Sequence, residues 1–308
     1  MRSLLLRASE NPTIAHTFPR YPSVRRAVTR FMPGEKLADA LKEAAVLRES
    51  NISTVLTYLG EDVSELTEAR RVTDHYHEVL DRISKHHLDC HISVKLTQLG
   101  LVFDREFCLS NLMSLVEQAA DLDNFVWIDM EESCYVDATL TMHRRVKSHY
   151  SSVGVCLQSY LFRTSNDFGS LRSLESAIRL VKGAYAEPPD VAYPRKKEVD
   201  ENFLVLATSM LQGVREGGLG AAFATHDLKL IRRICEEASF RGIPGELLEF
   251  QMLYGIKSEE QARLVRQGYG VRVLISYGSA WFPWYMRRLA ERPANIFFLV
   301  RNLFPLFS

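Results

Sequence analysis

Eight short apolar runs recur along this chain of 308 residues, and longer amphipathic segments separate them. The runs are rich in β-branched and aliphatic residues and lack strict polar alternation, which is typical of parallel strands covered on both faces. They span residues 52–59, 91–97, 125–130, 153–158, 178–184, 220–226, 248–253 and 271–277. Strands that alternate with helices predict an α/β fold built on one parallel sheet.

The segments between these runs show helical periodicity, most clearly at residues 64–84, 200–218 and 258–270. The last of them ends in glycines, where a helix is expected to stop. Eight strand–helix units predict a (β/α)8 barrel of the TIM type, whose usual size is about 250 residues. An open doubly wound sheet is the alternative, but it needs a Gly-rich phosphate loop after an early strand, and "YLGEDVSE" is not one.

We expect residues 1–34 to form an N-terminal helical extension and residues 35–308 to form the barrel, which ends in an apolar helix at 295–308. That helix is too short to span a bilayer. It would cover the barrel or an oligomer interface, or it would contact a membrane peripherally. No stretch reaches the roughly 18 apolar residues of a transmembrane helix, and the N-terminal "LLL" is too short for a secretory signal. The expected location is the cytoplasm.

Charge and cysteine content exclude some classes of function. The 38 basic and 38 acidic residues cancel, so no nucleic-acid surface is expected and any anion must be bound by local groups. The five cysteines form no C-x-x-C pair, which indicates reduced thiols and no zinc site.

Polar side chains mark the end of nearly every predicted strand. The active sites of (β/α)8 barrels lie at these C-terminal ends. The residues are Tyr58, Lys95, Asp129, Glu131, Gln158, Lys182, His226, Gln251 and Tyr277. Desolvating such a ring is costly unless a ligand or a network satisfies it. The sequence shows no Cys/His ligand set and no serine–histidine–acid arrangement. A divalent metal held by Asp129, Glu131 and Glu132 is an alternative, but "DMEE" is explained more simply as a strand end that runs into a helix start. An organic cofactor for electron or hydride transfer fits best.

Several long motifs, in order, resemble the proline dehydrogenase family over nearly the whole chain. They are "RFMPGEKLADAL" (30–41), "LTYLGEDVSE" (56–65), "FVWIDMEES" (125–133), "RLVKGAYAEPPDVAYP" (179–194), "ATHD" (224–227) and "WFPWYMRRLAERPAN" (281–295). The resemblance implies a barrel that holds FAD non-covalently and oxidises L-proline to Δ1-pyrroline-5-carboxylate, the first step of proline catabolism. Hydride would pass to flavin N5, and the electrons to a quinone in a membrane. The implied enzyme is monofunctional, cytoplasmic or peripheral at the inner face of the membrane, and compatible with a homo-oligomer.

The resemblance also implies roles for individual residues. Arg287 and Arg288 would clamp the proline carboxylate with help from Lys95, and Glu291 would hold the arginines and contact the flavin. Tyr185, Leu253 and Tyr277 would wall the pyrrolidine ring. The residues implied to contact FAD are Asp129, Gln158, Arg179, Val181, Lys182, Ala184, His226 and Glu291. Arg179 would lie nearest flavin N5 and stabilise negative charge on the reduced ring, so Lys95, Arg179 and Tyr277 are the catalytic candidates.

Two positions depart from the family pattern. Ser276 stands where many relatives carry proline, and Ala186 stands where some carry a bulky aromatic residue against the flavin. Two alternative functions stay open from the sequence. One is oxidation of a related cyclic amino acid such as hydroxyproline. The other is a catalytically silent barrel that acts as a binding subunit.

Overall fold

The computed structural model describes residues 28–60, 63–282 and 284–286. The expected N-terminal extension lies outside these residues apart from 28–34, and the expected apolar helix at 295–308 lies wholly outside them. The division of the chain at residue 34 stays a prediction.

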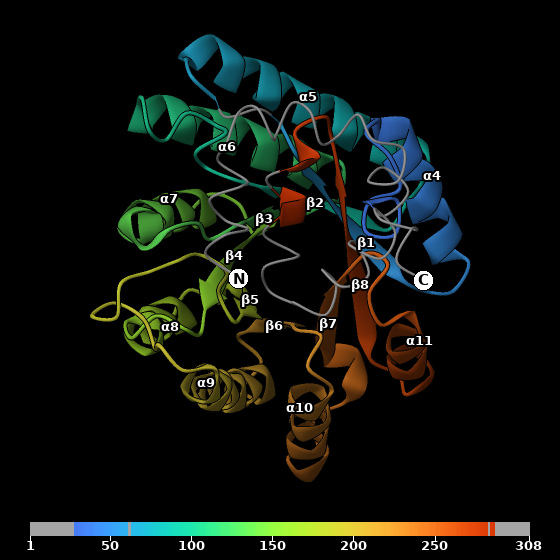
Figure 1. The fold of residues 1–308 in the computed structure, drawn as a ribbon, viewed down its shortest axis with the longest axis vertical. Coiled ribbons are helices and arrows are strands. Elements are labelled where there is room, and N and C mark those ends of the chain that lie inside the picture. The colour runs from blue at the N-terminus through green and yellow to red at the C-terminus, as the bar shows by residue number, and fades with distance from the viewer. Residues whose placement is uncertain (1–27, 61–62, 283, 287–308) are drawn as a thin grey trace, which may run out of the picture.

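Eight parallel strands close into a barrel in the order in which they occur along the chain (Figure 1). The strands are β1 Ser53–Tyr58, β2 Cys90–Val94, β3 Val126–Ile128, β4 Val153–Gln158, β5 Ala177–Val181, β6 Gly220–Ala224, β7 Leu248–Leu253 and β8 Gly270–Tyr277. The barrel closes through the pairing of β1 with β8, which runs from Ser53 opposite Arg272 to Tyr58 opposite Tyr277. The predicted (β/α)8 fold and all eight of its strands are confirmed.

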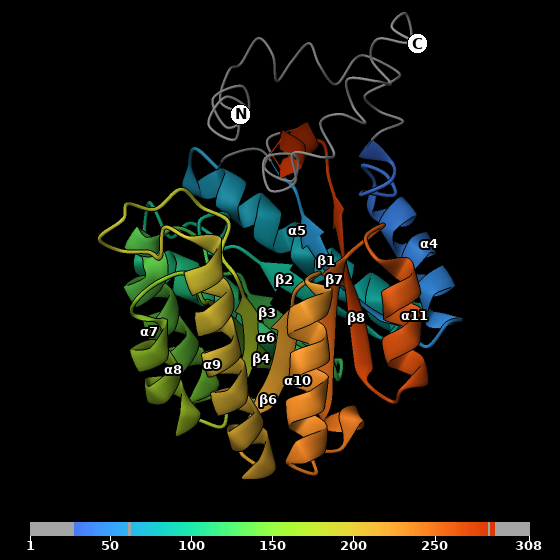
Figure 2. The ribbon, with the colours of Figure 1, turned by 60° about the horizontal axis from the view of Figure 1, so that its bottom comes forward.

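Helices surround the strands and shield them from solvent (Figures 1 and 2). They are α4 Leu37–Arg48, α5 Leu66–Lys85, α6 Arg105–Asp121, α7 Val136–Lys147, α8 Thr164–Arg172, α9 Lys196–Arg215, α10 Leu228–Phe240 and α11 Ser258–Arg266, with short 3-10 turns η2 Ser133–Tyr135 and η3 Gly245–Leu247. The three helices expected from periodicity correspond to α5, α9 and α11. Among the described residues, no helix combines the length and the apolar character needed to cross a membrane.

Five strands, β1, β2, β3, β5 and β6, end earlier than the apolar runs that predicted them. β2 stops at Val94, β3 at Ile128 and β5 at Val181. The backbone after β2 turns at once, since the amide of Gln98 donates to the carbonyl of Lys95 at 3.1 Å. After β5, Gly183 has a φ of +107°, a left-handed conformation that a strand does not adopt. The residue that follows each of β2, β3 and β5 therefore lies at the mouth of the barrel.

Two layers of side chains fill the molecule. The larger one is apolar and lies between strands and helices, where residues such as Leu112, Phe203 and Phe223 are fully buried. The smaller one lies inside the barrel, where Trp127 packs with Val55 and Ala222. Strand side chains alternate between these layers, and several that face inward are charged or polar. Burying them costs free energy unless they are paired, so the barrel interior is where function is sought.

Candidate active site

The predicted site residues that the structure describes gather at one end of the barrel because all eight strands run in the same direction. Tyr58, Gln158, Leu253 and Tyr277 are the last residues of their strands. Lys95, Asp129 and Lys182 are the first residues after theirs, and His226 follows β6 by two. Gln251 differs from the sequence expectation, since it lies within β7 instead of at its end.

Arg179 is the centre of the polar cluster. On β5 its neighbours Ile178 and Leu180 belong to the outer apolar layer, so Arg179 faces the barrel interior, where it is 2% exposed. Its Nη2 donates to the Ser93 Oγ at 2.8 Å and to the Asp129 Oδ1, and its Nη1 donates to the Gln251 Oε1 at 3.2 Å.

The aromatic ring of Trp127 also holds the Arg179 guanidinium. Its centroid lies 5.1 Å from the Arg179 Cζ, within the range of a cation–π interaction. The indole N–H of Trp127 donates in turn to the His91 Nδ1 at 3.3 Å. Burial and the charges of Arg272 and Arg179 lower the pKa of His91 well below its usual value, so this ring is neutral. Groups from β2, β3 and β7 thus fix one buried cation.

A second cluster joins the loops after β2 and β3 to the end of β4. Glu131, 7% exposed, accepts hydrogen bonds from the Thr97 amide at 3.1 Å and the Thr97 hydroxyl at 2.7 Å. Burial raises the pKa of Glu131, and the bonds from Thr97 and the charge of Lys95 only partly oppose that effect. The positive charge of Lys95 therefore favours the ionised form of a buried carboxyl group.

Gln158 ends β4 beside this cluster with one polar atom unsatisfied. Its Nε2 donates to the carbonyls of Met130 and Glu131, both at 3.2 Å. Its Oε1 is buried and has no hydrogen-bond partner among the described residues. A buried acceptor left alone costs free energy, so this oxygen points to a ligand with a hydrogen-bond donor.

Three rings pack together where β1 and β8 end. The Tyr277 hydroxyl lies 2.9 Å from the His75 Nε2, and the Tyr58 ring lies 4.5 Å from that of His75 and 5.5 Å from that of Tyr277. Burial raises the pKa of Tyr277 well above 10, so its hydroxyl stays protonated. Burial lowers the pKa of His75, on α5. The sequence did not single out His75, because nothing in a helical pattern shows that its ring reaches the barrel mouth.

His226 and Leu253 meet across the ends of β6 and β7. The Leu253 amide donates to the His226 Nε2 at 2.8 Å. Because Nε2 accepts this bond, the neutral imidazole carries its proton on Nδ1. The structure therefore places a predicted cofactor residue directly against a predicted substrate residue.

Lys182 belongs to a cluster of two lysines and two aspartates at the mouth of the barrel. Its ammonium lies 2.5 Å from the Asp200 Oδ1 and 3.0 Å from the Asp227 Oδ2, and Lys196 contacts both carboxylates as well. Burial alone would raise the pKa of Asp227, but the bond and charge of Lys182 outweigh it and bring that pKa to about 2. These ion pairs join β5, α9 and the loop after β6.

Val181, Ala184 and Tyr185, all half-buried, belong to the segment that leaves β5. Gly183 lies between them, and a Cβ added there would lie 2.2 Å from the ring of Tyr160. Further along, Glu187 accepts hydrogen bonds from the Ser133 amide at 2.7 Å and the Ser133 hydroxyl at 2.5 Å. The segment is thereby tied to η2, after β3. The remaining site predictions, Arg287, Arg288 and Glu291, lie outside the described residues.

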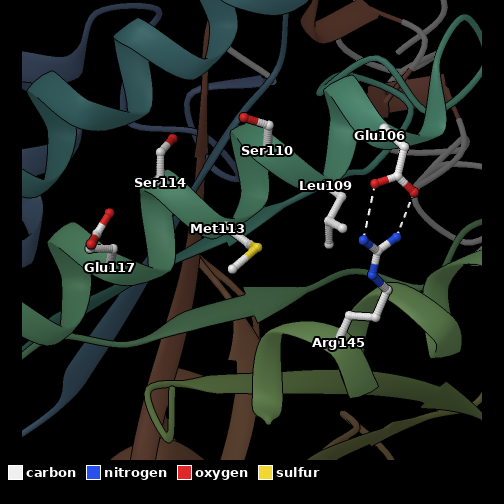
Figure 3. Close-up of a pocket in the computed structure, with 7 residues that line it drawn as sticks. All are labelled: Glu106, Leu109, Ser110, Met113, Ser114, Glu117 and Arg145. Carbon is white, nitrogen blue, oxygen red and sulfur yellow. Dashed lines mark hydrogen bonds and ion pairs between the residues drawn. The ribbon is translucent and has the colours of Figure 1, made fainter. Parts of the chain in front are cut away.

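A hollow of about 380 Å³ lies apart from this site, on the flank formed by α6 and α7 (Figure 3). It is lined by Glu106, Leu109, Ser110, Met113, Ser114, Glu117 and Arg145. All of these side chains come from helices of the outer ring, and Glu106 pairs with Arg145 at 2.5 Å. No strand contributes to this hollow, so the polar cluster at the strand ends remains the candidate active site.

The sequence model of the family described as "Proline dehydrogenase" matches residues 40–301. The chain belongs to the proline dehydrogenase family. Proline dehydrogenase 1 of Bacillus subtilis subsp. natto is 35% identical over 303 residues, which cover 98% of this chain and 99% of the relative. Proline dehydrogenase of Deinococcus radiodurans is 34% identical over 279 residues and 89% of both chains.

Solved structures resemble this member of the proline dehydrogenase family in fold. Proline utilization A (PutA) of Bdellovibrio bacteriovorus, in a form inactivated by N-propargylglycine, superposes with a TM-score of 0.80 at 23% identity. The match covers 94% of this chain but 37% of PutA, so the chain spans about a third of that protein. The likeness shows that the closed barrel is shared with PutA.

Proposed function

We propose that this chain oxidises L-proline to Δ1-pyrroline-5-carboxylate with a non-covalently bound FAD and passes the electrons to a quinone. The observation that carries the proposal is the buried Arg179, fixed by Asp129, Ser93 and Gln251 at the strand ends of a barrel of the proline dehydrogenase family. A fixed cation in a dry site is suited to stabilise negative charge that develops during a reaction.

The residues present fit FAD. When bound, FAD would accept a hydride from the substrate and hold its electrons for the next acceptor. The unsatisfied Gln158 Oε1 would accept a hydrogen bond from the flavin, whose ring system carries an N–H group. Arg179 would favour negative charge on the reduced ring. Asp129 would orient Arg179, and Val181, Lys182, Ala184 and His226 would border the cofactor.

The proposed substrate contacts are a second set of residues. Lys95 would attract the proline carboxylate, while Arg287 and Arg288 would bind it through their planar forks and Glu291 would orient them. Tyr277 and Leu253 would confine the ring, together with Tyr185. The His75 contact supports this role, because a hydrogen bond at 2.9 Å fixes the orientation of the Tyr277 ring.

The first experiment is an anaerobic visible spectrum of the purified protein, recorded before and after addition of L-proline and, in parallel, of hydroxyproline. We expect oxidised-flavin bands that bleach with proline. A protein that stays colourless when FAD is supplied would contradict the cofactor assignment. Bound flavin that only hydroxyproline reduces would reassign the substrate, and bound flavin that neither reduces would favour a silent barrel.

A further inference from the structure

A row of hydrogen-bonded side chains runs from Arg179 through the interior of the barrel. Gln251 accepts from the Arg179 Nη1 through Oε1 and donates through Nε2 to the Glu249 Oε1 at 2.6 Å. The other oxygen of Glu249 accepts from the Arg272 Nε at 2.9 Å. The Nη1 of Arg272 then donates to the Asp89 Oδ1 at 3.1 Å. Cation, amide, carboxylate, cation and carboxylate follow one another without a break.

The row joins the two ends of the barrel. Glu249 and Gln251 are two residues apart on β7, so both face inward, while Phe250 between them is buried in the outer apolar layer. Arg272 lies near the start of β8, and Asp89 immediately precedes β2. The Arg179 end lies toward the candidate site, and the Asp89 end lies at the opposite, N-terminal mouth.

Burying these charged and polar side chains inside a barrel of this kind costs free energy. The inward layers of (β/α)8 barrels are filled mainly by branched apolar side chains. Here Arg179 is 2% exposed, Gln251 3% and Arg272 6%. A buried ion pair is often no more stabilising than apolar residues of similar volume, so packing alone gives no reason for it. Burial opposes the charge on Arg272, yet Glu249 and Asp89 outweigh it and raise its pKa above the ordinary value.

The charges on both sides set the orientation of the Gln251 amide. Its oxygen faces the guanidinium of Arg179 and its nitrogen faces the carboxylate of Glu249. A flipped amide would place N–H against N–H and oxygen against oxygen, so the flip is disfavoured. Gln251, itself held by Glu249, therefore fixes the Nη1 of Arg179, while Ser93 and Asp129 fix its Nη2.

We propose that Gln251 and Glu249, which Arg272 holds in place, are positioning residues for Arg179. They fix its guanidinium, and the negative charge of Glu249 partly offsets the positive potential that Arg179 produces at the cofactor. The inference rests on the proposed function, in which Arg179 lies nearest the reacting part of the flavin. It adds to that function a set of residues that touch neither substrate nor cofactor.

Gln251→Met tests the positioning role, and Gln261→Met on α11 is the matched control. Gln261 is also 3% exposed and bonded, through its Nε2, to the Ile256 carbonyl at 2.9 Å, but it lies outside the barrel interior. We expect Gln251→Met to lower kcat by about tenfold or more, with the KM for proline within about twofold, and to change the flavin midpoint potential. Gln261→Met should change only the thermal midpoint of unfolding.

Glu249→Gln tests the charge. Gln at this position keeps an acceptor for Arg272 but removes one negative charge behind Arg179, and it also removes the acceptor of the Gln251 Nε2. The reduced flavin is the more negative form, so its formation becomes easier and the midpoint potential should rise. This readout needs bound flavin but no turnover, so it remains valid if proline proves not to be the substrate.

The outcomes separate the two proposals. Gln251→Met with the kcat and potential of the wild type would make the row purely structural, as would an unchanged potential in Glu249→Gln where Gln251→Met fails to fold. A wild-type protein that binds flavin but ignores proline would contradict the proposed substrate and leave this test intact. A wild-type protein that binds no flavin would overturn both.

Discussion

At the scale of single residues, the site depends on charges held at fixed places. Arg179 and Asp129 were both expected from the family resemblance, and the structure joins them in an ion pair. Their partners Ser93 and Gln251 had no assigned role. The sequence places these residues far apart, and only the closed barrel brings β2, β5 and β7 around one guanidinium. No local pattern carries that information.

Lys95 provides the first prediction at this scale. Lys95→Met should raise the KM for proline about tenfold or more. The proline carboxylate loses a positive partner, and the positive charge that opposes Glu131 is removed as well. Steady-state kinetics with proline measure the effect. Lys147→Met, which alters another half-buried lysine on α7, is the control and should leave KM unchanged. Unaltered kinetics in Lys95→Met would assign Lys95 a structural role.

At the scale of elements, the strands were predictable because their pattern is local. Apolar runs between turn signals are read from a few residues, and each of the eight became a strand. Strand ends were less predictable, since β3 stops at Ile128 although Met130 is also apolar and buried. Beyond that point the side chains of Asp129 and Glu131 bond to Arg179 on β5 and to Thr97 in the loop after β2.

The segment after β5 gives the second prediction. Gly183→Ala forces a residue with a Cβ into a φ of +107° and against the ring of Tyr160. We expect a loss of unfolding free energy of about 1–3 kcal/mol, together with weaker FAD binding, because this segment borders the proposed cofactor site. Chemical denaturation and flavin titration measure both.

Gly169→Ala is the contrasting control for this change. Gly169 lies within α8 and a Cβ there would meet nothing within 4 Å. Alanine should therefore stabilise the protein by about 0.5–1 kcal/mol. Equal effects of the two substitutions would show that Gly183 has no conformational role.

His143 on α7 gives a pH-dependent prediction. Its two ring nitrogens are buried without a hydrogen-bond partner among the described residues. Burial first, and then the charges of Lys147 and Arg144, lower its pKa from 6.5 to about 4. Between these values the unfolded chain binds the proton and the native protein does not, so stability falls as the pH drops from about 6.5 to about 4. The shift corresponds to about 3 kcal/mol.

His143→Leu should remove that part of the acid sensitivity. Urea unfolding of both proteins at neutral pH and near pH 4 gives the measurement, and the variant should lose about 3 kcal/mol less than the wild type on acidification. Its absolute stability at neutral pH is not the test, because the substitution also alters packing. Identical losses in the two proteins would show that His143 is not the group responsible.

At the scale of the whole molecule, one barrel serves two purposes. Its outer layer is an apolar core that the helices complete, and its interior is a charged row that spans the barrel from Asp89 to Arg179. The fold class followed from the count and period of the apolar runs. The interior row did not, because Glu249 and Arg272 each look like an ordinary polar residue in a strand until the register of β7 and β8 places them together.

Binding of FAD should couple to the stability of this whole unit. A ligand that binds only the native state stabilises it in proportion to the logarithm of its concentration, by about 2.7 kcal/mol at 100 times its Kd. For a domain of this size we expect FAD to raise the thermal midpoint of the flavin-free protein by about 5 °C. Gln158→Met should reduce that increase because it removes the unsatisfied Oε1, whereas Gln261→Met should preserve it. A midpoint independent of FAD would contradict the cofactor site, and an equal increase in Gln158→Met would exclude Gln158 from it.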